Sequence, residues 1–169
     1  MIEFACHTRG FNDQPLEAAL GTVARLGFRY VDLGSGPHLD VVAATEKPDK
    51  TAATFRELLE TFNLRVSDLY IMLPRISIAD DARRQHEITS FERLLPFAVA
   101  LGVPGITVSP GLHKQGPPEE VVPRVADALG QFVALAGEHD IALSFEPHLD
   151  SVTQTPEHAL DLLNRVDGL

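Results

Sequence analysis

Residues 141–148 read Ile-Ala-Leu-Ser-Phe-Glu-Pro-His, and the rest of the chain is interpreted outward from this stretch. Successive residues of a strand face opposite sides, so its large apolar side chains lie on one side and its small or polar ones on the other. The polar side ends in Glu146 and His148. Pro147 between them has no backbone N–H, so we expect the regular ladder to end there and both side chains to project from the strand's end. A strand that stops at a charged, solvated turn would give the same pattern.

Strand-like and helix-like patterns alternate five times along the chain. Strands are predicted over residues 2–7, 30–34, 66–73, 105–109 and 141–148, and apolar residues at helical spacing follow each of them. In the first strand we expect Ile2, Phe4 and Cys6 on the apolar face. Pro96 should kink or divide the helix that ends at Gly102, and Pro123 suggests first-turn geometry up to that point in the next helix. The last helix is expected to bury a stripe of Leu160, Leu163 and Val166.

Repeated strand–helix alternation predicts parallel βα units. A flavodoxin-like open doubly wound sheet is the alternative, but its strands are covered on both faces and read as continuous apolar runs. Here each predicted strand has one apolar and one small or polar face, which favours a parallel (β/α) TIM-barrel type. No glycine-rich phosphate loop follows the first strand.

The predicted barrel is incomplete. A full barrel has eight units in roughly 250 residues, so about five βα units match this length. We therefore predict that residues 1–169 form a single partial (β/α) barrel domain. Either a C-terminal half is missing or a partner chain, such as a second copy, supplies the rest, because open parallel edges are rarely left uncovered.

Composition excludes several classes of partner. The chain has a net charge of −10, whereas nucleic-acid and anionic-membrane surfaces need clustered Lys and Arg. Cys6 is the only cysteine, so no intramolecular disulfide is possible, and its place on the apolar face predicts a core thiol. We find no secretory signal pattern and no apolar run long enough to span a bilayer, and we expect a cytoplasmic protein.

Polar side chains at the strand ends form the candidate site. In a parallel barrel the carboxyl ends of the strands deliver their side chains to one mouth. Carboxylate and imidazole groups together suit a divalent metal such as Mn²⁺, Mg²⁺, Co²⁺ or Zn²⁺, which stabilises negative charge developing beside a sugar carbonyl. For the two loop histidines a solvated or capping role is the commoner one. The candidates are His7, Asp32, Ser109, Glu146 and His148, with His38 and His113 in the loops.

Three motifs give the chain a family resemblance. They are Tyr-Val-Asp-Leu-Gly at residues 30–34, Val-Ser-Pro-Gly at 108–111, and Ser-Phe-Glu-Pro-His at 144–148 with Thr-Pro-Glu at 155–157. With these the whole chain resembles the xylose isomerase-like barrels that include sugar phosphate isomerases and epimerases. The resemblance implies that Glu146 ligates the metal and acts in proton transfer, and that His148 binds or supports the substrate. The family's other metal ligands come from strands six to eight, which this sequence lacks.

We therefore predict a metal-dependent isomerase or epimerase of carbohydrate metabolism. Its substrate would be a small sugar, sugar phosphate or polyol ketone, with His7, Asp32, His113 and His148 in binding roles, and the chain is expected to be inactive alone. The alternative is a non-catalytic partial barrel that acts by associating with another chain. A zinc endonuclease of the same superfamily is rejected, because Ser109 stands where that chemistry needs histidine and the third strand also ends without one.

Overall fold

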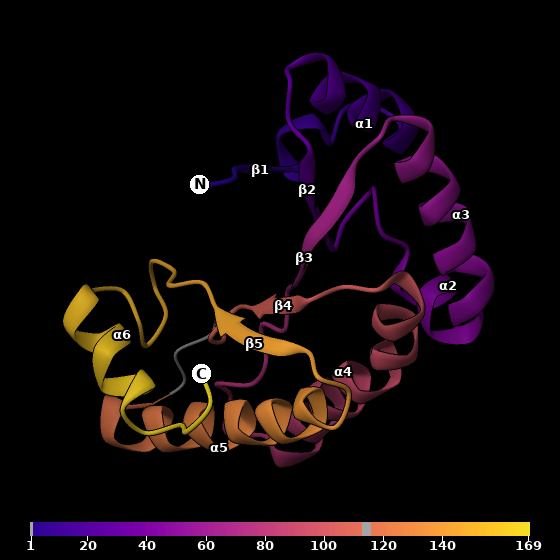
Figure 1. The fold of residues 1–169 in the computed structure, drawn as a ribbon. Coiled ribbons are helices and arrows are strands. Elements are labelled where there is room, and N and C mark those ends of the chain that lie inside the picture. The colour runs from indigo at the N-terminus through magenta and orange to yellow at the C-terminus, as the bar shows by residue number, and fades with distance from the viewer. Residues whose placement is uncertain (1, 113–115) are drawn as a thin grey trace. The chain divides into compact units, whose positions relative to one another are not determined.

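The structure is a computed structural model that describes residues 2–112 and 116–169. Strands and helices alternate from β1 to α6 (Figure 1). The strands are β1 Ala5–His7, β2 Tyr30–Gly34, β3 Arg65–Ile71, β4 Gly105–Val108 and β5 Ala142–Phe145. The helices are α1 Leu16–Arg25, α2 Val41–Glu46, α3 Pro48–Thr61, α4 Asp81–Leu101, α5 Pro118–Gly137 and α6 Pro156–Leu163, with a short 3₁₀ helix η1 at Thr8–Phe11.

The strands form one sheet in the order β1-β2-β3-β4-β5. β1 pairs in parallel with β2, and β2 in parallel with β3. A flavodoxin-like sheet would have the order 2-1-3-4-5, so the sequential order excludes that alternative and confirms the barrel-type parallel fold. Among the described strands β1 and β5 are the two ends of the order, and the sheet is open as predicted for about five units.

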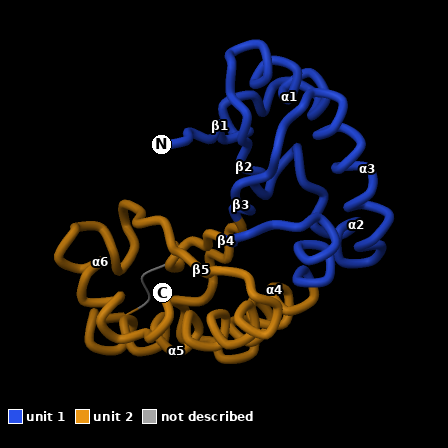
Figure 2. Tube along the Cα trace, in the orientation of Figure 1, with its two compact units in different colours: residues 1–70, 94–106 blue, residues 71–93, 107–169 orange. Residues whose placement is uncertain are grey.

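The chain divides into two compact units, residues 1–70 with 94–106 and residues 71–93 with 107–169 (Figure 2). The prediction of one domain stays a prediction. In the first unit Leu20 and Val23 of α1 and Val31 and Leu33 of β2 are fully buried. The rings of Phe55 in α3 and Phe97 in α4 meet edge to face, with centroids 5.7 Å apart.

The second unit has its own aromatic centre. Phe91 of α4 and Phe132 of α5 lie 4.5 Å apart between ring centroids, and both are buried. Leu143 of β5 is buried while its neighbours Ala142 and Ser144 are exposed, as the two-faced pattern of that strand predicted. None of the helices in the described part of the chain has the length and apolar character that a membrane span requires.

The first strand and the last helix differ from the sequence predictions. β1 begins only at Ala5, and Ile2 and Phe4 are 82% and 73% exposed, because no described strand lies beyond β1 in the sheet order. In α6 the buried stripe runs through Leu162 rather than Leu160 and Leu163, which are exposed. Val166 is buried as expected.

Two helices also differ. α4 continues through Pro96, so this proline does not divide the helix, and a kink there stays a prediction. Pro123 lies past the first turn of α5, contrary to the expectation. Pro96 is exposed, which places its missing backbone donor on the solvent side of α4.

Candidate functional site

His7 stands at the carboxyl end of β1 in a fixed orientation. Its Nδ1 accepts a hydrogen bond from the backbone N–H of Arg9 at 3.0 Å, so the neutral ring carries its proton on Nε2 and presents a donor there. The ring meets the ring of Tyr70 edge to face, with centroids 5.7 Å apart. A Cβ at Gly34 would lie 2.6 Å from Cε1 of His7. Glycine at position 34 therefore makes room for the imidazole at the end of β2.

Asp32 lies beside His7 because the two residues are register partners in β1 and β2. The register of β2 and β3 shifts between Val31 and Asp32, and the shift leaves Ser67 as an extra residue of β3. The hydroxyl of Ser67 bonds to the carbonyl oxygen of Val31 at 3.1 Å and also to the carboxylate of Asp32. The bulge thus holds Asp32, and the predicted substrate role of this carboxylate stays a prediction.

The charge of Asp32 also acts on the thiol of Cys6. Burial raises the pKa of its thiol, and the negative charge of Asp32 raises it further. A thiol held in its neutral form is a poor nucleophile and a poor metal ligand. Cys6 is a free cysteine that is only partly buried, so it is not part of the buried core in which the sequence placed it.

Glu146 and His148 are brought together in the second unit. The backbone N–H of Glu146 bonds to the carbonyl of Val108 at 3.0 Å, which fixes the carboxyl end of β5 against β4. His148 Nε2 lies 3.8 Å from Glu146 Oε2, too long for a hydrogen bond but close enough for electrostatic stabilisation of the carboxylate by a protonated ring. The side chains of Glu146 and His148 are 55% and 22% exposed, so the carboxylate can be reached from solvent.

The remaining predicted residues are not open to a ligand or are not described. Ser109 is fully buried, and its hydroxyl accepts the backbone N–H of Leu73 at 3.1 Å. His38 is buried, with Nε2 bonded to the carbonyl of Gln14 at 2.9 Å, which is a structural role. His113 lies outside the described residues.

The donor atoms support only part of a metal site. Glu146 and His148 offer one carboxylate and one imidazole, a combination that divalent zinc or manganese accepts. Within residues 2–112 and 116–169, however, no three His, Cys, Asp or Glu side chains gather around one point. Two donors do not complete a site, so no chemical step is assigned to a metal here.

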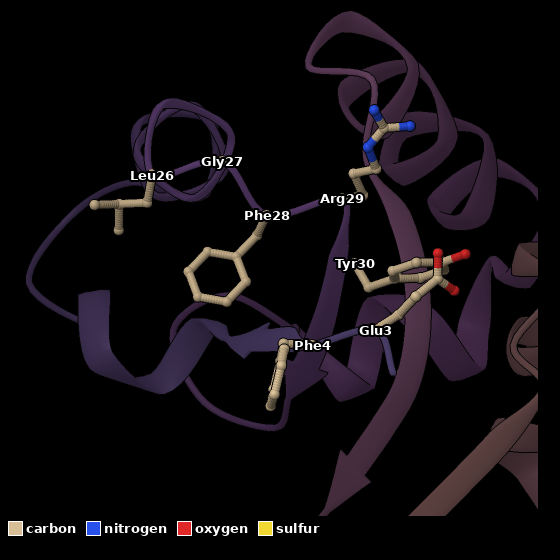
Figure 3. A pocket seen from close by; sticks show the side chains of 7 residues that line it. All are labelled: Glu3, Phe4, Leu26, Gly27, Phe28, Arg29 and Tyr30. Carbon is tan, nitrogen blue, oxygen red and sulfur yellow. The ribbon is translucent and has the colours of Figure 1, made fainter. Parts of the chain in front are cut away.

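A hollow of about 550 Å³ lies at the amino ends of β1 and β2 in the first unit, opposite the carboxyl ends that carry His7 and Asp32 (Figure 3). Its lining comes from residues before β1, from the turn after α1 and from the start of β2, so it opens at the amino ends of these strands. The lining is Glu3, Phe4, Leu26, Gly27, Phe28, Arg29 and Tyr30. Parallel barrels place their chemistry at the carboxyl ends of the strands, so this hollow is not the candidate site.

Sequence reasoning missed the residues that hold the candidate side chains. The signal for the bulge was present, because Ser67 and Asp68 are adjacent polar residues that break the alternation of β3. Ser151 and Thr153 follow His148 and are both buried. A Ser-x-Thr sequence after a strand is typical of a turn closed by side-chain hydroxyls, and that signal was not used.

Comparison with known proteins identifies the fold. A family model described as Xylose isomerase-like TIM barrel matches residues 20–169. No relative was found among curated protein sequences. Three similar solved structures are a D-psicose 3-epimerase in the presence of D-fructose, an IOLI protein with a bound zinc atom, and a xylose isomerase-like TIM barrel protein from Mycobacterium smegmatis in complex with magnesium.

These structures share the fold at low sequence identity. The epimerase is 15% identical with a TM-score of 0.78, and the match covers 99% of this chain and 61% of that one. The IOLI protein is 20% identical with a TM-score of 0.77, and the match covers 98% of this chain and 59% of that one. The Mycobacterium smegmatis protein is 20% identical with a TM-score of 0.72, and the match covers 99% of this chain and 64% of that one. The chain thus spans about three-fifths of the length of these solved structures.

Proposed function

The chain belongs to the xylose isomerase-like TIM barrel family, and from that premise we propose that it carries the Glu146 half of a sugar isomerase or epimerase site. The single observation that supports this is the pair at the end of β5, a reachable Glu146 carboxylate with the His148 imidazole 3.8 Å away. Several solved relatives are named as epimerases of ketoses, and one contains D-fructose. We take a small ketose, free or phosphorylated, as the substrate class.

In the proposed reaction Glu146 removes a proton from the carbon next to the substrate carbonyl. The C–H bond breaks, a carboxyl O–H bond forms, and the electron pair moves toward the carbonyl oxygen to give an enediolate. Return of the same proton restores the substrate, whereas a proton delivered from solvent to the opposite face of that carbon gives the epimer. Glu146 then releases its proton to solvent and is a carboxylate again. A positioned general base of this kind contributes about 10²- to 10⁴-fold to a rate. In this scheme His148 stabilises the carboxylate or binds a substrate oxygen.

We also propose roles for the first unit and for a metal. His7 would offer its Nε2–H to a substrate oxygen, and Asp32 would accept from a hydroxyl; His113 is retained as a binding candidate from the sequence. Glu146 would be one ligand of a divalent cation in a complete barrel, in line with the zinc and magnesium in two relatives. Because the chain covers 59–66% of the solved relatives, we propose that turnover requires the remainder of a barrel from further sequence or a second chain.

The test is exchange of the carbon-bound proton with solvent. Two preparations are compared: the recombinant 169-residue chain, and the protein isolated from its source organism, which is called the native preparation. Each is incubated in D₂O with D-fructose and Mn²⁺, and deuterium on the carbon next to the carbonyl is followed by NMR. We expect exchange in at least the native preparation, and a loss of roughly 10²-fold or more in Glu146→Gln. Glu138→Gln removes an exposed carboxylate of the same unit and should leave exchange unchanged. Undiminished exchange in Glu146→Gln contradicts the assignment.

A binding measurement accompanies the exchange assay. Mn²⁺ binding to the native preparation, followed by electron paramagnetic resonance, should weaken in Glu146→Gln and stay unchanged in Glu138→Gln. Equal binding in both variants would remove Glu146 from the metal proposal while leaving its role as a base open to the exchange assay.

One observation favours a second, non-catalytic function. Large apolar side chains are exposed at both ends of the chain, among them Ile2 and Phe4 before β1 and Leu149 after β5. Such surfaces mark contacts with another chain. Association with another chain is therefore the alternative function, and sedimentation of the chain at several salt concentrations tests it.

A further inference from the structure

His148 is followed by a tight turn that ties its backbone to Ser151. The carbonyl oxygen of His148 accepts the hydroxyl of Ser151 at 2.6 Å and the backbone N–H of the same residue at 3.4 Å. Asp150 takes a left-handed conformation with φ +60° inside this turn. Leu149 at its tip is 82% exposed, so the loop is held from its inner side by Ser151 rather than by packing of its outer side.

The hydrogen bonds of Ser151 can be assigned completely. A serine hydroxyl has one proton to donate and two lone pairs to accept with. Its proton goes to the carbonyl of His148, because a carbonyl can only accept. The contact of 2.9 Å between the hydroxyls of Ser151 and Thr153 must then have Thr153 as the donor. The backbone N–H of Thr153 fills the second lone pair at 3.0 Å.

Ser151 is therefore saturated by three hydrogen bonds in a buried position. Both Ser151 and Thr153 are only 1% exposed. Buried groups left without a partner are costly, which makes this hydroxyl pair a rigid support for the turn. Neither residue contributes a side chain to the Glu146–His148 pair.

The two members of that pair are held by different anchors. Glu146 is fixed through its backbone to Val108 of β4, within the sheet. His148 lies beyond the end of β5, and its carbonyl oxygen accepts the hydroxyl of Ser151. Nε2 of His148 lies 3.8 Å from Oε2 of Glu146.

We propose that Ser151 is a positioning residue, which fixes the backbone of His148 so that its imidazole faces the Glu146 carboxylate. Thr153 in turn supports the Ser151 hydroxyl without touching His148. The effect of Ser151 on catalysis rests on the proposed function. The effect of Ser151 on the position of the His148 ring does not, and it can be measured with no substrate present.

Three variants separate positioning from general stability. Ser151→Ala removes the bond to His148 and leaves Thr153 without its acceptor. Ser151→Thr keeps the hydroxyl, and its added methyl has room because Ser151 lines a cavity of about 120 Å³. Thr153→Val is the matched control, since it removes one support of Ser151 from the same buried cluster but leaves the bond from Ser151 to His148 in place.

The direct measurement is the NMR signal of the His148 ring in the native protein, assigned by its loss in His148→Gln. We expect Ser151→Ala to shift and broaden this signal, Ser151→Thr to restore it, and Thr153→Val to leave it near its original position despite a lower melting temperature. An unchanged signal in Ser151→Ala would overturn the proposal. An equal displacement in Thr153→Val would also overturn it, because the turn would then act only through stability.

Exchange of the ketose proton then tests the link to function. Ser151→Ala should lower the rate constant about 10- to 100-fold with little change in half-saturation, as a misplaced group does. In the His148→Gln background the same substitution should have no further effect. If wild-type protein shows no exchange but the ring signal behaves as expected, the proposed function fails and the positioning role stands.

Discussion

Among single side chains, Glu87 carries a charge that the fold disfavours. It lies in α4 with its side chain only 7% exposed, and its partner Arg75 is 3.4 Å away and half exposed. Burial raises the pKa of the Glu87 carboxyl above its usual 4.5, although the charges of Arg75 and His86 act in the opposite direction. Desolvation therefore outweighs the ion pair, as it often does for buried charges.

The raised pKa predicts a pH dependence of stability with a definite sign. A carboxyl whose pKa is higher in the folded state stabilises the fold when protonated. This contribution is fully present below pH 4.5 and is lost as the pH rises through the raised pKa. At neutral pH we expect Glu87→Gln to raise the free energy of unfolding by about 1 kcal/mol.

Urea unfolding over a pH series from below 4.5 to neutral measures this effect. As the pH rises, the wild type should lose the stability linked to Glu87, whereas Glu87→Gln should not. Glu92→Gln, an exposed carboxylate on the same helix, should follow the wild type at every pH. A lower stability of Glu87→Gln at neutral pH would show that the pair with Arg75 outweighs the burial of the charge.

The sequence alone predicted the candidate side chains, but it did not predict the hydrogen bonds that hold them in place. The two-residue spacing of Glu146 and His148 at a strand end was sufficient to predict that they project together. Ser151 supports His148 through a backbone carbonyl, and such a bond leaves no pattern of residue types beyond a common turn signal. His38 lies in a loop, where a role other than ligand binding was judged the commoner one, and its buried bond to a carbonyl agrees with that.

At the level of elements, α4 is continuous although Pro96 lies within it. Proline has no N–H for the carbonyl of residue 92 and its ring crowds that carbonyl, at a cost of about 3 kcal/mol. Replacing it by alanine restores the bond but gives the unfolded chain more freedom, which offsets about 0.4–1 kcal/mol. We expect Pro96→Ala to raise the free energy of unfolding by about 2–2.6 kcal/mol.

Pro118→Ala supplies the comparison for this prediction. Pro118 is the first residue of α5, where the backbone N–H has no helical partner in any case. Its replacement should change stability by less than about 0.5 kcal/mol. Equal effects of the two substitutions in urea unfolding would mean that α4 has adapted to Pro96 without strain.

The order of the elements was predictable from the sequence, whereas some boundaries were not. Period-two and helical patterns located all five strands, and the polar inner faces correctly favoured the barrel type. The pattern of residues 2–7 suggested a full strand, but pairing begins at Ala5, whose partner Tyr30 is the first residue of β2. Helix continuity through Pro96 depends on tertiary packing, which local propensity does not include.

For the whole molecule, exposed apolar side chains predict association. Ile2, Phe4 and Leu26 are 62–82% exposed in the first unit, and Phe4 and Leu26 line the hollow of Figure 3. In the second unit Leu149, Leu160 and Leu163 are 39–82% exposed. Single exposed apolar residues are ordinary, but Phe4 and Leu26 line one hollow, and apolar surface of this kind favours contact with another chain.

The net charge of −10 opposes association between copies and sets its response to salt. Salt screens like charges while it leaves apolar burial intact or strengthens it. We therefore expect the 169-residue chain to sediment above its monomer mass of 18.4 kDa, and more so as salt is raised. Phe4→Ser and Leu160→Ser should each shift the distribution toward monomer, whereas Val42→Ser, at an exposed valine of α2 outside both groups, should not. A monomer at every salt concentration would exclude self-association of the chain.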